Sequence, residues 1–371
     1  MMRLASAALL LLLAAACQRQ PQSDPAPAPA AAENVATAAP APGDPAYIAE
    51  DPALARLVGQ PAPAIKLQMV DGRKLDLKTL YGTRPVYLKL WATYCIPCRA
   101  QMPGFEKIYE TYGDRMAVIA VNAGVGDDAA KVRAFAQQYD MHMPLAIDDG
   151  ALGAWIKLQA TPLHIIIGRD GRVAYAGHQD GPQLDAAIEK AIAAKGGEPV
   201  AATDVASIAA LRPGDMVPAI ALRNSRGQRV ELKRGATPRP RAILFTSVWC
   251  ESYLKDTEPE SVPKCRHARE AVDRLAGSGG VDWLGIVSHL WTGPQDLGHY
   301  EAEAKPRIAM AIDTDGTAFR TFGIRRFPAV ALIDKEGRLV RVVGPDETDI
   351  AGAVAALAPH GGQRMENPDR S

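Results

Sequence analysis

The sequence predicts an α/β protein made of two similar layered units, each with a mixed central sheet flanked by helices. Two observations favour this fold class. Apolar, β-rich runs alternate with helical patterns along the chain, and this order is typical of α/β layer folds. The chain also repeats itself within its 371 residues, a length that accommodates two domains of about 150 residues each with extra segments.

The first unit contains strands, helices and a hairpin in the order that such a fold requires. Short apolar runs predict strands, and apolar residues three or four positions apart predict helices. An Asp-Gly pair between two apolar runs predicts a tight hairpin turn. The elements expected in this way are a strand over 85–92, a helix over 98–112, a strand over 116–122, a helix over 127–139, a hairpin over 163–177 that turns at Asp170-Gly171, and a closing helix over 183–194.

The second unit is a displaced copy of the first. Matching glycines, prolines and cysteines lie 155 residues apart in the front half of each copy, as Cys95 and Cys250 do. In the back half the offset is 166, as for Pro162 and Pro328. The difference between these offsets, 166 against 155, indicates a net insertion of 11 residues in the second copy after its first cysteine. Residues 331–343 predict a hairpin like that of the first copy.

These patterns predict how the whole chain is organised. Domain 1 (53–195) and domain 2 (211–358) are joined by a linker (196–210) rich in glycine and small residues, and a polar tail (359–371) follows. The chain carries 42 basic and 42 acidic residues, so its formal net charge is zero. Because phosphate binding draws on clustered Lys and Arg, this balance argues against a nucleic-acid partner.

The N-terminus predicts export and a membrane tether. Residues 1–16 contain an apolar run too short to span a bilayer, which is typical of a cleaved signal peptide. Cys17 follows three alanines and resembles the lipidated cysteine of a bacterial lipobox, whereas the alternative is an ordinary signal that leaves a free thiol. Gln18 after it resembles the outer-membrane sorting pattern of Gram-negative bacteria. Residues 17–52 are largely an Ala/Pro-rich spacer that cannot bury enough surface to order itself.

Cys95 and Cys98 form a C-x-x-C motif where a predicted strand meets a predicted helix. Free N–H groups and the dipole at a helix N-terminus favour a thiolate, so Cys95 is the expected nucleophile. Cys98, one turn into the helix, is the expected resolving thiol, and Pro97 suits a helix start. Half of a zinc site is one alternative, but the chain has no second C-x-x-C. A structural disulfide is another, although so short a loop gains only about 2 kcal/mol from chain entropy.

The segment WATYCIPCR (91–99), Pro103 and the Thr161-Pro162 pair resemble the thioredoxin superfamily, specifically the periplasmic thioredoxin-like reductases of the TlpA/ResA/redoxin kind. The resemblance covers domain 1. It implies that Pro162 follows a cis peptide bond beside the active disulfide, and that Trp91, Thr161 and Pro162 contact the substrate. It also implies reduction of protein disulfides, no cofactor, and electrons supplied by a membrane thiol donor.

Two positions depart from that family. Lys89 stands where thioredoxin carries a buried Asp, and Gln101 stands where ResA-like proteins often carry Glu. If Lys89 faces the sulfurs, its ammonium favours the thiolate; otherwise its amine extends to solvent. Thiol peroxidase action is an enzymatic alternative, but Leu88 and Ala92 stand where peroxiredoxin-like proteins carry Pro and Thr or Ser.

Domain 2 keeps Cys250 in register, whereas its second cysteine is displaced to Cys265. A disulfide across this longer loop would contribute about 3 kcal/mol by chain entropy, so a structural bridge, a redox-active pair and a metal site all remain open. A metal site would also draw on His267 and His289, and would resemble the copper-handling SCO proteins, although the spacing differs. With Cys17 and the domain 1 pair, these two account for all five cysteines.

Together these patterns predict a membrane-tethered periplasmic thiol-disulfide oxidoreductase that acts on protein disulfides through Cys95 and Cys98, with no metal at its site. The alternative from another class is a substrate-docking or metal-handling protein that works through domain 2.

Overall fold

A computed structural model describes residues 52–205 and 208–357 of the chain. The predicted signal peptide, Cys17 and the polar tail (359–371) lie outside the described residues, as does the spacer up to residue 51. No helix in the described ranges is long and apolar enough to cross a membrane.

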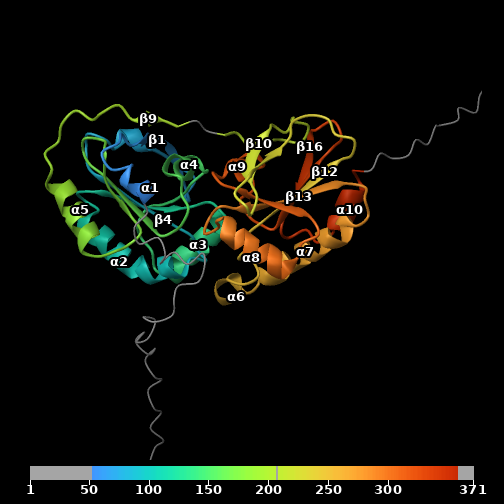
Figure 1. Cartoon of the computed structure of the whole chain (residues 1–371). Helices are drawn as coiled ribbons and strands as arrows, with labels where there is room; N and C mark the ends of the chain where they lie inside the picture. Colours follow the sequence, from blue (N-terminus) through green and yellow to red (C-terminus); the bar gives the residue numbers. More distant parts are fainter. Residues whose placement is uncertain (1–51, 206–207, 358–371) are drawn as a thin grey trace, which may run out of the picture. The chain divides into compact units, whose positions relative to one another are not determined.

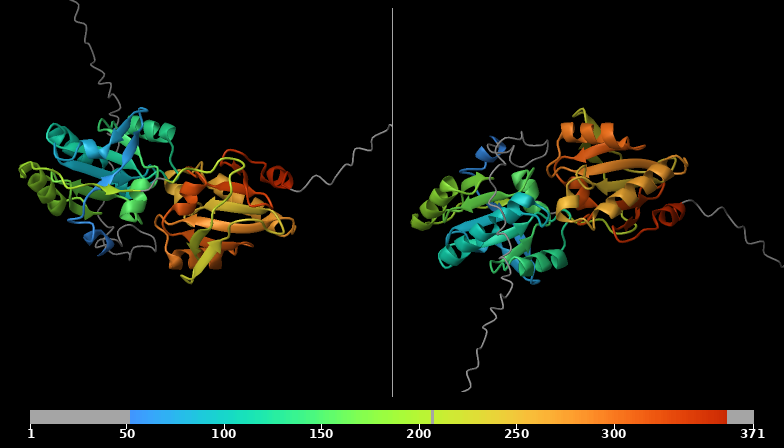
Figure 2. Two further views of the ribbon diagram at one scale, coloured as in Figure 1. Left: turned by 90° about the horizontal axis from the view of Figure 1, so that it is seen from above. Right: turned by 90° about the horizontal axis from the view of Figure 1, so that it is seen from below.

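Domain 1 contains a mixed sheet flanked by helices (Figures 1 and 2). Its strands are β1 (Pro63–Ala64), β2 (Lys66–Met69), β3 (Lys74–Asp76), β4 (Val86–Trp91), β5 (Ala117–Asn122), β6 (Leu145–Ile147), β7 (Leu163–Ile167) and β8 (Val173–Gly177). Its helices are α1 (Pro52–Ala55), the 3₁₀ turn η2 (Leu77–Thr79), α2 (Ile96–Tyr112), α3 (Ala129–Gln138), α4 (Ala151–Ile156) and α5 (Pro182–Ala193). Seven strands form the sheet in the order β3-β2-β6-β5-β4-β7-β8.

Domain 2 repeats this arrangement. Its strands are β10 (Ile220–Arg223), β11 (Arg229–Leu232), β12 (Arg241–Thr246), β13 (Asp282–Ser288), β14 (Ala309–Asp313), β15 (Ala329–Ile333) and β16 (Leu339–Val343). Its helices are α6 (Leu254–Thr257), α7 (Val262–Ala276), α8 (Pro294–Ala304), α9 (Thr317–Thr321) and α10 (Ile350–Ala355). The order β11-β10-β14-β13-β12-β15-β16 matches that of domain 1 strand for strand. The predicted fold class, two mixed sheets flanked by helices, is therefore confirmed.

The two sheets also share their register. In domain 1, Val86 pairs with Ala117 on the parallel neighbour and with Ile167 on the antiparallel one. In domain 2, the residue matching Val86 is Arg241, which pairs with Asp282 and Ile333, the matching residues of β13 and β15. Every residue of one sheet centre therefore has an identified counterpart in the other.

The central strands are buried on both faces. All six residues of β4, β5 and β12 are buried, as expected for parallel strands covered by helices. On α2 the buried residues Cys98, Met102 and Phe105 lie three or four positions apart, so one face of the helix packs on the sheet. The core therefore holds the second cysteine of the C-x-x-C motif.

Part of the predicted linker packs on domain 1. The two-residue strand β9 (Thr203–Asp204) pairs in parallel with β1, and the Thr203 amide donates to the carbonyl oxygen of Ala62 at 2.8 Å. The Val200 amide likewise donates to the carbonyl oxygen of Asp170 at 3.0 Å. These bonds attach the middle of the linker to domain 1.

Candidate active site

Cys95 and Cys98 lie at the start of α2, where the sequence placed them. Their sulfurs form a disulfide, and the Cys95 sulfur caps the helix by accepting a hydrogen bond from the Cys98 amide at 3.2 Å. Pro97 occupies the first turn, where its missing N–H costs no hydrogen bond. When the disulfide is reduced, the amides and dipole at this helix end stabilise a thiolate at Cys95.

The loop before β7 lies against the same sulfur. The Thr161-Pro162 peptide bond is cis, as the family resemblance implies, and the Cys95 sulfur lies 3.5 Å from the carbonyl oxygen of Thr161. Nδ1 of His178 lies 2.6 Å from the carbonyl oxygen of Pro162. A backbone donor brought to Thr161 would therefore lie beside the disulfide.

Trp91 does not share this surface. Its side chain is fully buried at the end of β4 and packs against Phe135, with ring centroids 5.0 Å apart. The predicted substrate contact of Trp91 stays a prediction, since its side chain is as buried in this structure as Cys95. Tyr94 is the aromatic residue of the motif that faces domain 2, where it contacts Trp249 and Trp291.

The two residues that depart from the family pattern bond to each other. Lys89 is 1% exposed in β4, and its Nζ donates to Oε1 of Gln101 at 2.6 Å. His164 lies opposite Lys89 in the sheet and places Nε2 3.1 Å from the same oxygen. Nδ1 of His164 lies 2.6 Å from the Tyr87 hydroxyl. The alternative in which the Lys89 amine extends to solvent is therefore wrong, and its partner is an amide oxygen one helical turn past Cys98.

These hydrogen-bonded side chains of Lys89, Gln101, His164 and Tyr87 form a polar chain, and burial determines which of them carry a proton. It lowers the pKa of Lys89 to about 7, against the opposing effect of Asp180. Burial also lowers the pKa of His164 well below its usual value, and the nearby Lys89 and His178 add to that effect. Near neutral pH the imidazole is neutral, and the amine can gain or lose a proton.

The cysteines of domain 2 also pair with each other. Cys250 and Cys265 form a disulfide, and the Phe327-Pro328 peptide bond is cis like its counterpart in domain 1. His267 is exposed, with Nε2 2.9 Å from the carbonyl oxygen of Thr348. The described residues contain no group of three or more His, Cys, Asp or Glu side chains that could hold a metal ion. Of the three interpretations of this pair, the metal site gains no support from the structure.

Domain 2 contacts the disulfide face of domain 1 through matched loops. The Gly126 amide donates to the carbonyl oxygen of Arg325, and the Trp291 amide donates to that of Gln159, both at 2.8 Å. In the register of the repeat, Gly126 corresponds to Trp291 and Gln159 to Arg325. Each domain thus offers the loops at matching positions to the other, which is the isologous arrangement of a two-fold dimer.

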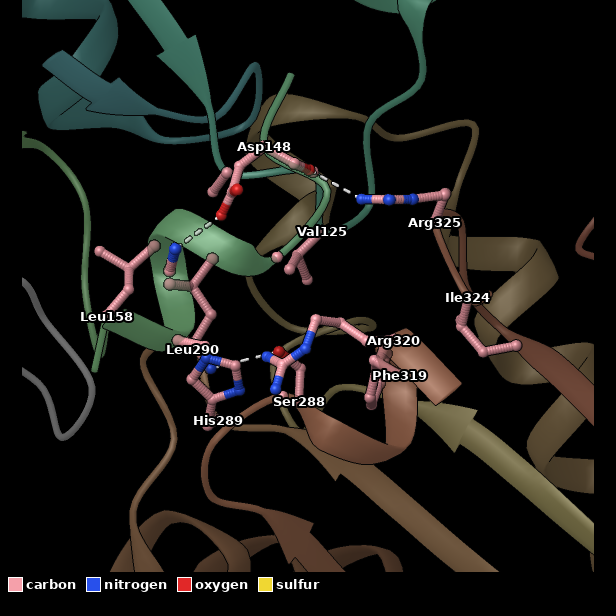
Figure 3. A pocket seen from close by; sticks show the side chains of 16 residues that line it. Val125, Asp148, Leu158, Ser288, His289, Leu290, Phe319, Arg320, Ile324 and Arg325 are labelled. Carbon is pink, nitrogen blue, oxygen red and sulfur yellow. Dashed lines mark hydrogen bonds between the residues drawn. The ribbon is translucent and has the colours of Figure 1, made fainter. Parts of the chain in front are cut away.

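A small cavity lies within this contact (Figure 3). Its volume of about 40 Å³ suits a few water molecules. Val125 and its counterpart Leu290 both line it, and Arg325 beside it donates through Nη1 to the carbonyl oxygen of Asp148 at 2.7 Å. His289 is also in its wall, and burial lowers the pKa of that imidazole to about 4, so it is neutral.

Comparisons with known proteins agree with this geometry. Residues 58–176 match the AhpC/TSA family. The chain is 39% identical to the thioredoxin-like protein YneN of Bacillus subtilis over 114 residues, which are 30% of this chain and 66%, just under two thirds, of that protein. It is 33% identical to the thiol-disulfide oxidoreductase ResA of Bacillus cereus over 138 residues, which are 36% of this chain and 78% of that protein. The chain belongs to the thioredoxin-like family of thiol-disulfide oxidoreductases.

The similarity to solved structures also covers about a third of this chain. A thiol:disulfide interchange protein from Chlorobium tepidum matches 36% of this chain and 97% of its own, with 19% identity and a TM-score of 0.32. The residues matched to the AhpC/TSA family lie within domain 1 and include both cysteines and the Thr161-Pro162 pair.

Proposed function

We propose that this chain reduces disulfides in protein substrates through Cys95 and Cys98. The observation that carries the proposal is the position of the Cys95 sulfur, which caps α2 and lies 3.5 Å from the Thr161 carbonyl oxygen. The helix end favours the reactive thiolate, and the carbonyl offers an acceptor to an extended substrate backbone. The relatives named thiol-disulfide oxidoreductase ResA support the same chemistry.

The exchange proceeds in two displacements. The Cys95 thiolate attacks one sulfur of the substrate disulfide, forms a mixed disulfide, and releases the other substrate sulfur, which takes up a proton. The Cys98 thiol then loses its proton and attacks Cys95, which breaks the mixed disulfide and releases the second substrate thiol. Two electrons pass to the substrate, and the Cys95–Cys98 disulfide seen in the structure is the product.

Insulin reduction followed by turbidity, with dithiothreitol as the electron source, tests this function. We expect the wild-type chain to speed insulin precipitation and Cys95→Ser to lose that acceleration, because the sulfur that caps α2 is then absent. A Cys250→Ser/Cys265→Ser double variant is the matched control, and it should keep at least the wild-type rate. Activity that survives in Cys95→Ser would remove the assignment to domain 1.

We also propose that the protein works in the periplasm, held at the outer membrane by lipid on Cys17 and supplied with electrons by a membrane thiol donor. The support is the sequence of residues 1–18 and the family resemblance. Metabolic labelling with radioactive palmitate tests the tether. We expect the label on the wild-type chain and none on Cys17→Ser, and an unlabelled wild-type chain would mean that Cys17 carries no lipid.

A further inference from the structure

The residues between Cys250 and Cys265 form a loop that reaches domain 1. This insertion loop, residues 251–264, takes the place of the two residues between Cys95 and Cys98 and contains the short helix α6. The disulfide joins its two ends, whose Cα atoms lie 6.0 Å apart. A closed loop has fewer conformations than an open one, so the disulfide restricts where the loop's side chains can lie.

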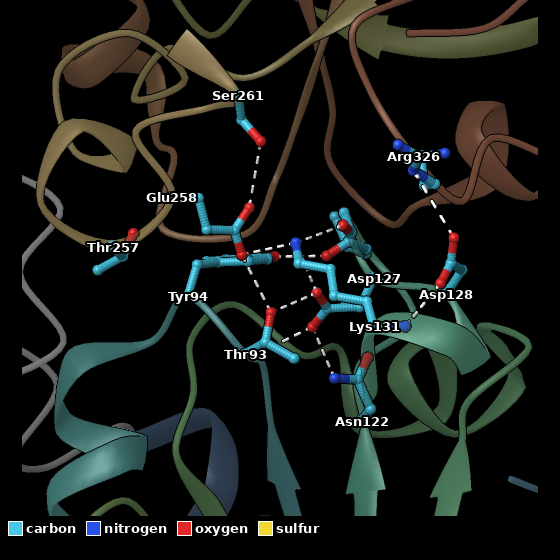
Figure 4. A network of polar contacts seen from close by, with 12 residues as sticks. Thr93, Tyr94, Asn122, Asp127, Asp128, Lys131, Thr257, Glu258, Ser261 and Arg326 are labelled. Atoms are coloured by element: carbon cyan, nitrogen blue, oxygen red, sulfur yellow. Dashed lines mark hydrogen bonds and ion pairs between the residues drawn. The ribbon is translucent and has the colours of Figure 1, made fainter. Parts of the chain in front are cut away.

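Glu258 of the insertion loop is bonded across the domain contact (Figure 4). Its side chain is buried, and Oε1 pairs with Nζ of Lys131 at 2.5 Å. The same oxygen lies 3.0 Å from the Thr93 hydroxyl, which lies 2.6 Å from Oδ1 of Asp127. Both partners belong to domain 1, and Thr93 is two residues before Cys95. A buried carboxylate is costly unless it is paired, so this group stabilises the arrangement in which the loop lies on domain 1.

The other contacts of the insertion loop surround the first turn of α2. The amide of Ile96, the residue between Cys95 and Pro97, donates to the Tyr253 hydroxyl at 3.0 Å. Nη2 of Arg99 donates to the carbonyl oxygen of Thr257 at 3.3 Å. The loop therefore uses an amide at the same helix end that holds the reactive sulfur.

Trp291 of domain 2 occupies the substrate side of the same sulfur. Its Nε1 donates to the carbonyl oxygen of Thr161 at 3.3 Å, and its amide donates to that of Gln159 at 2.8 Å. Its ring packs edge-on against Tyr94 at 5.5 Å. The acceptor beside Cys95 that would receive a substrate backbone is thus already bonded.

The consequence is that neither sulfur of domain 1 is accessible. Cys95 and Cys98 are both 0% exposed, whereas exchange requires an attacking sulfur to reach one of them directly. We propose that the insertion loop and Trp291 form an internal cover over the Cys95–Cys98 disulfide, and that a protein substrate reaches Cys95 by displacing this cover. The identity of what displaces it rests on the proposed function, but the cover itself does not.

The rate at which dithiothreitol reduces Cys95–Cys98 in the full-length oxidised chain tests the cover. Thiols are trapped with N-ethylmaleimide at set times, and mass spectrometry of the peptide that contains Cys95 follows this disulfide separately from Cys250–Cys265. We expect Glu258→Gln to raise the rate roughly fivefold or more, because it removes one partner of a buried charged contact. Glu260→Gln is the matched control, since it makes the same chemical change at an exposed position of the same loop, and it should leave the rate unchanged.

Two further variants keep the test decisive if Glu258→Gln folds poorly. Tyr253→Phe removes only the hydroxyl bonded to Ile96, and the Cys250→Ser/Cys265→Ser double variant opens the loop, so both should also raise the rate. Equal rates in the wild type and all three variants would overturn the cover. Because dithiothreitol attacks the disulfide directly, a chain that fails to reduce insulin but reacts faster as Glu258→Gln would lose the proposed function and keep the cover.

Discussion

Domain 1 and domain 2 share a sheet register but differ in the buried residues at four matching positions. Domain 1 buries a polar chain in which Lys89 and His164 meet at the side-chain oxygen of Gln101, and His164 continues to Tyr87. The matching positions of domain 2 hold only apolar residues, all buried. For Lys89, His164, Gln101 and Tyr87 in turn, they are Leu244, Val330, Ala268 and Ala242.

Only domain 1 buries titratable side chains at these four positions. A buried amine costs folding free energy unless it is bonded, so an interior without such groups is easier to stabilise. Domain 1 buries the amine of Lys89 in β4, whose pKa is lowered to about 7, and bonds it to Gln101, one helical turn past Cys98 on α2. Domain 2 has no such group at the matching positions.

The helices that follow Cys95 and Cys250 also differ, in their length. Cys95 caps α2, a helix of 17 residues, whereas Cys250 precedes α6, a helix of only 4 residues. Cys265 is the fourth residue of α7. A longer helix presents more aligned peptide dipoles to a thiolate at its N-terminus, so Cys95 is expected to be the stronger nucleophile of the two.

The largest expected difference between the domains is in trapping a substrate. In Cys98→Ser the first displacement still occurs but the second cannot, so a mixed disulfide between Cys95 and the substrate should accumulate to near completion. In Cys265→Ser the remaining Cys250 lacks the long helix, and no mixed disulfide at Cys250 should accumulate. Non-reducing gel electrophoresis after incubation with oxidised insulin, with mass spectrometry of the linked peptides, measures both.

The opposite result would make the two disulfides alike. A mixed disulfide at Cys250 as abundant as the one at Cys95 would mean that the second pair is redox-active, which was one of the interpretations left open by the sequence. The Cys95→Ser/Cys98→Ser double variant is the control, since it leaves domain 2 intact and should form no mixed disulfide.

The sequence predicted what depends on local pattern. Apolar runs located β4, β5 and the hairpin β7–β8, and the C-x-x-C motif located the start of α2. The family resemblance supplied the cis bond before Pro162, which no local pattern requires. The sequence does not predict the short strands β2 and β3, because segments of four and three residues contain too few alternating positions to indicate a strand.

The contacts around the disulfide depend instead on which distant segments meet. The Ile96 amide and the Tyr253 hydroxyl are 157 residues apart in the chain, and the Thr93 hydroxyl and Glu258 are 165 apart. Lys89 and Gln101 each depart from the family pattern in the sequence. Their side chains bond to each other because β4 and α2 lie side by side, which no local pattern predicts. Local motifs do not predict these contacts, since tertiary packing determines which distant residues meet.

The buried amine of Lys89 should also have a smaller effect, on the pH dependence of stability. Lys89→Leu gives domain 1 the leucine that domain 2 carries at the matching position, Leu244. The pKa of Lys89 is about 7 in the folded chain, below the 10.5 of a free lysine, so between these values the unfolded chain binds more protons. The free energy of unfolding of the wild type therefore rises with pH in this window, by up to about 1.4 kcal/mol per pH unit from this group.

We expect Lys89→Leu to lack this rise, so that its stability relative to the wild type is greatest near pH 7 and falls by about 1 kcal/mol per unit toward pH 9. Urea unfolding of the oxidised chains at pH 7, 8 and 9 measures the difference. Lys107→Leu, on the exposed side of α2, is the matched control and should track the wild type at every pH. Parallel curves for Lys89→Leu and the wild type would mean that the buried amine does not titrate near neutral pH, and the polar chain of domain 1 would then be a packing feature like the apolar residues that match it.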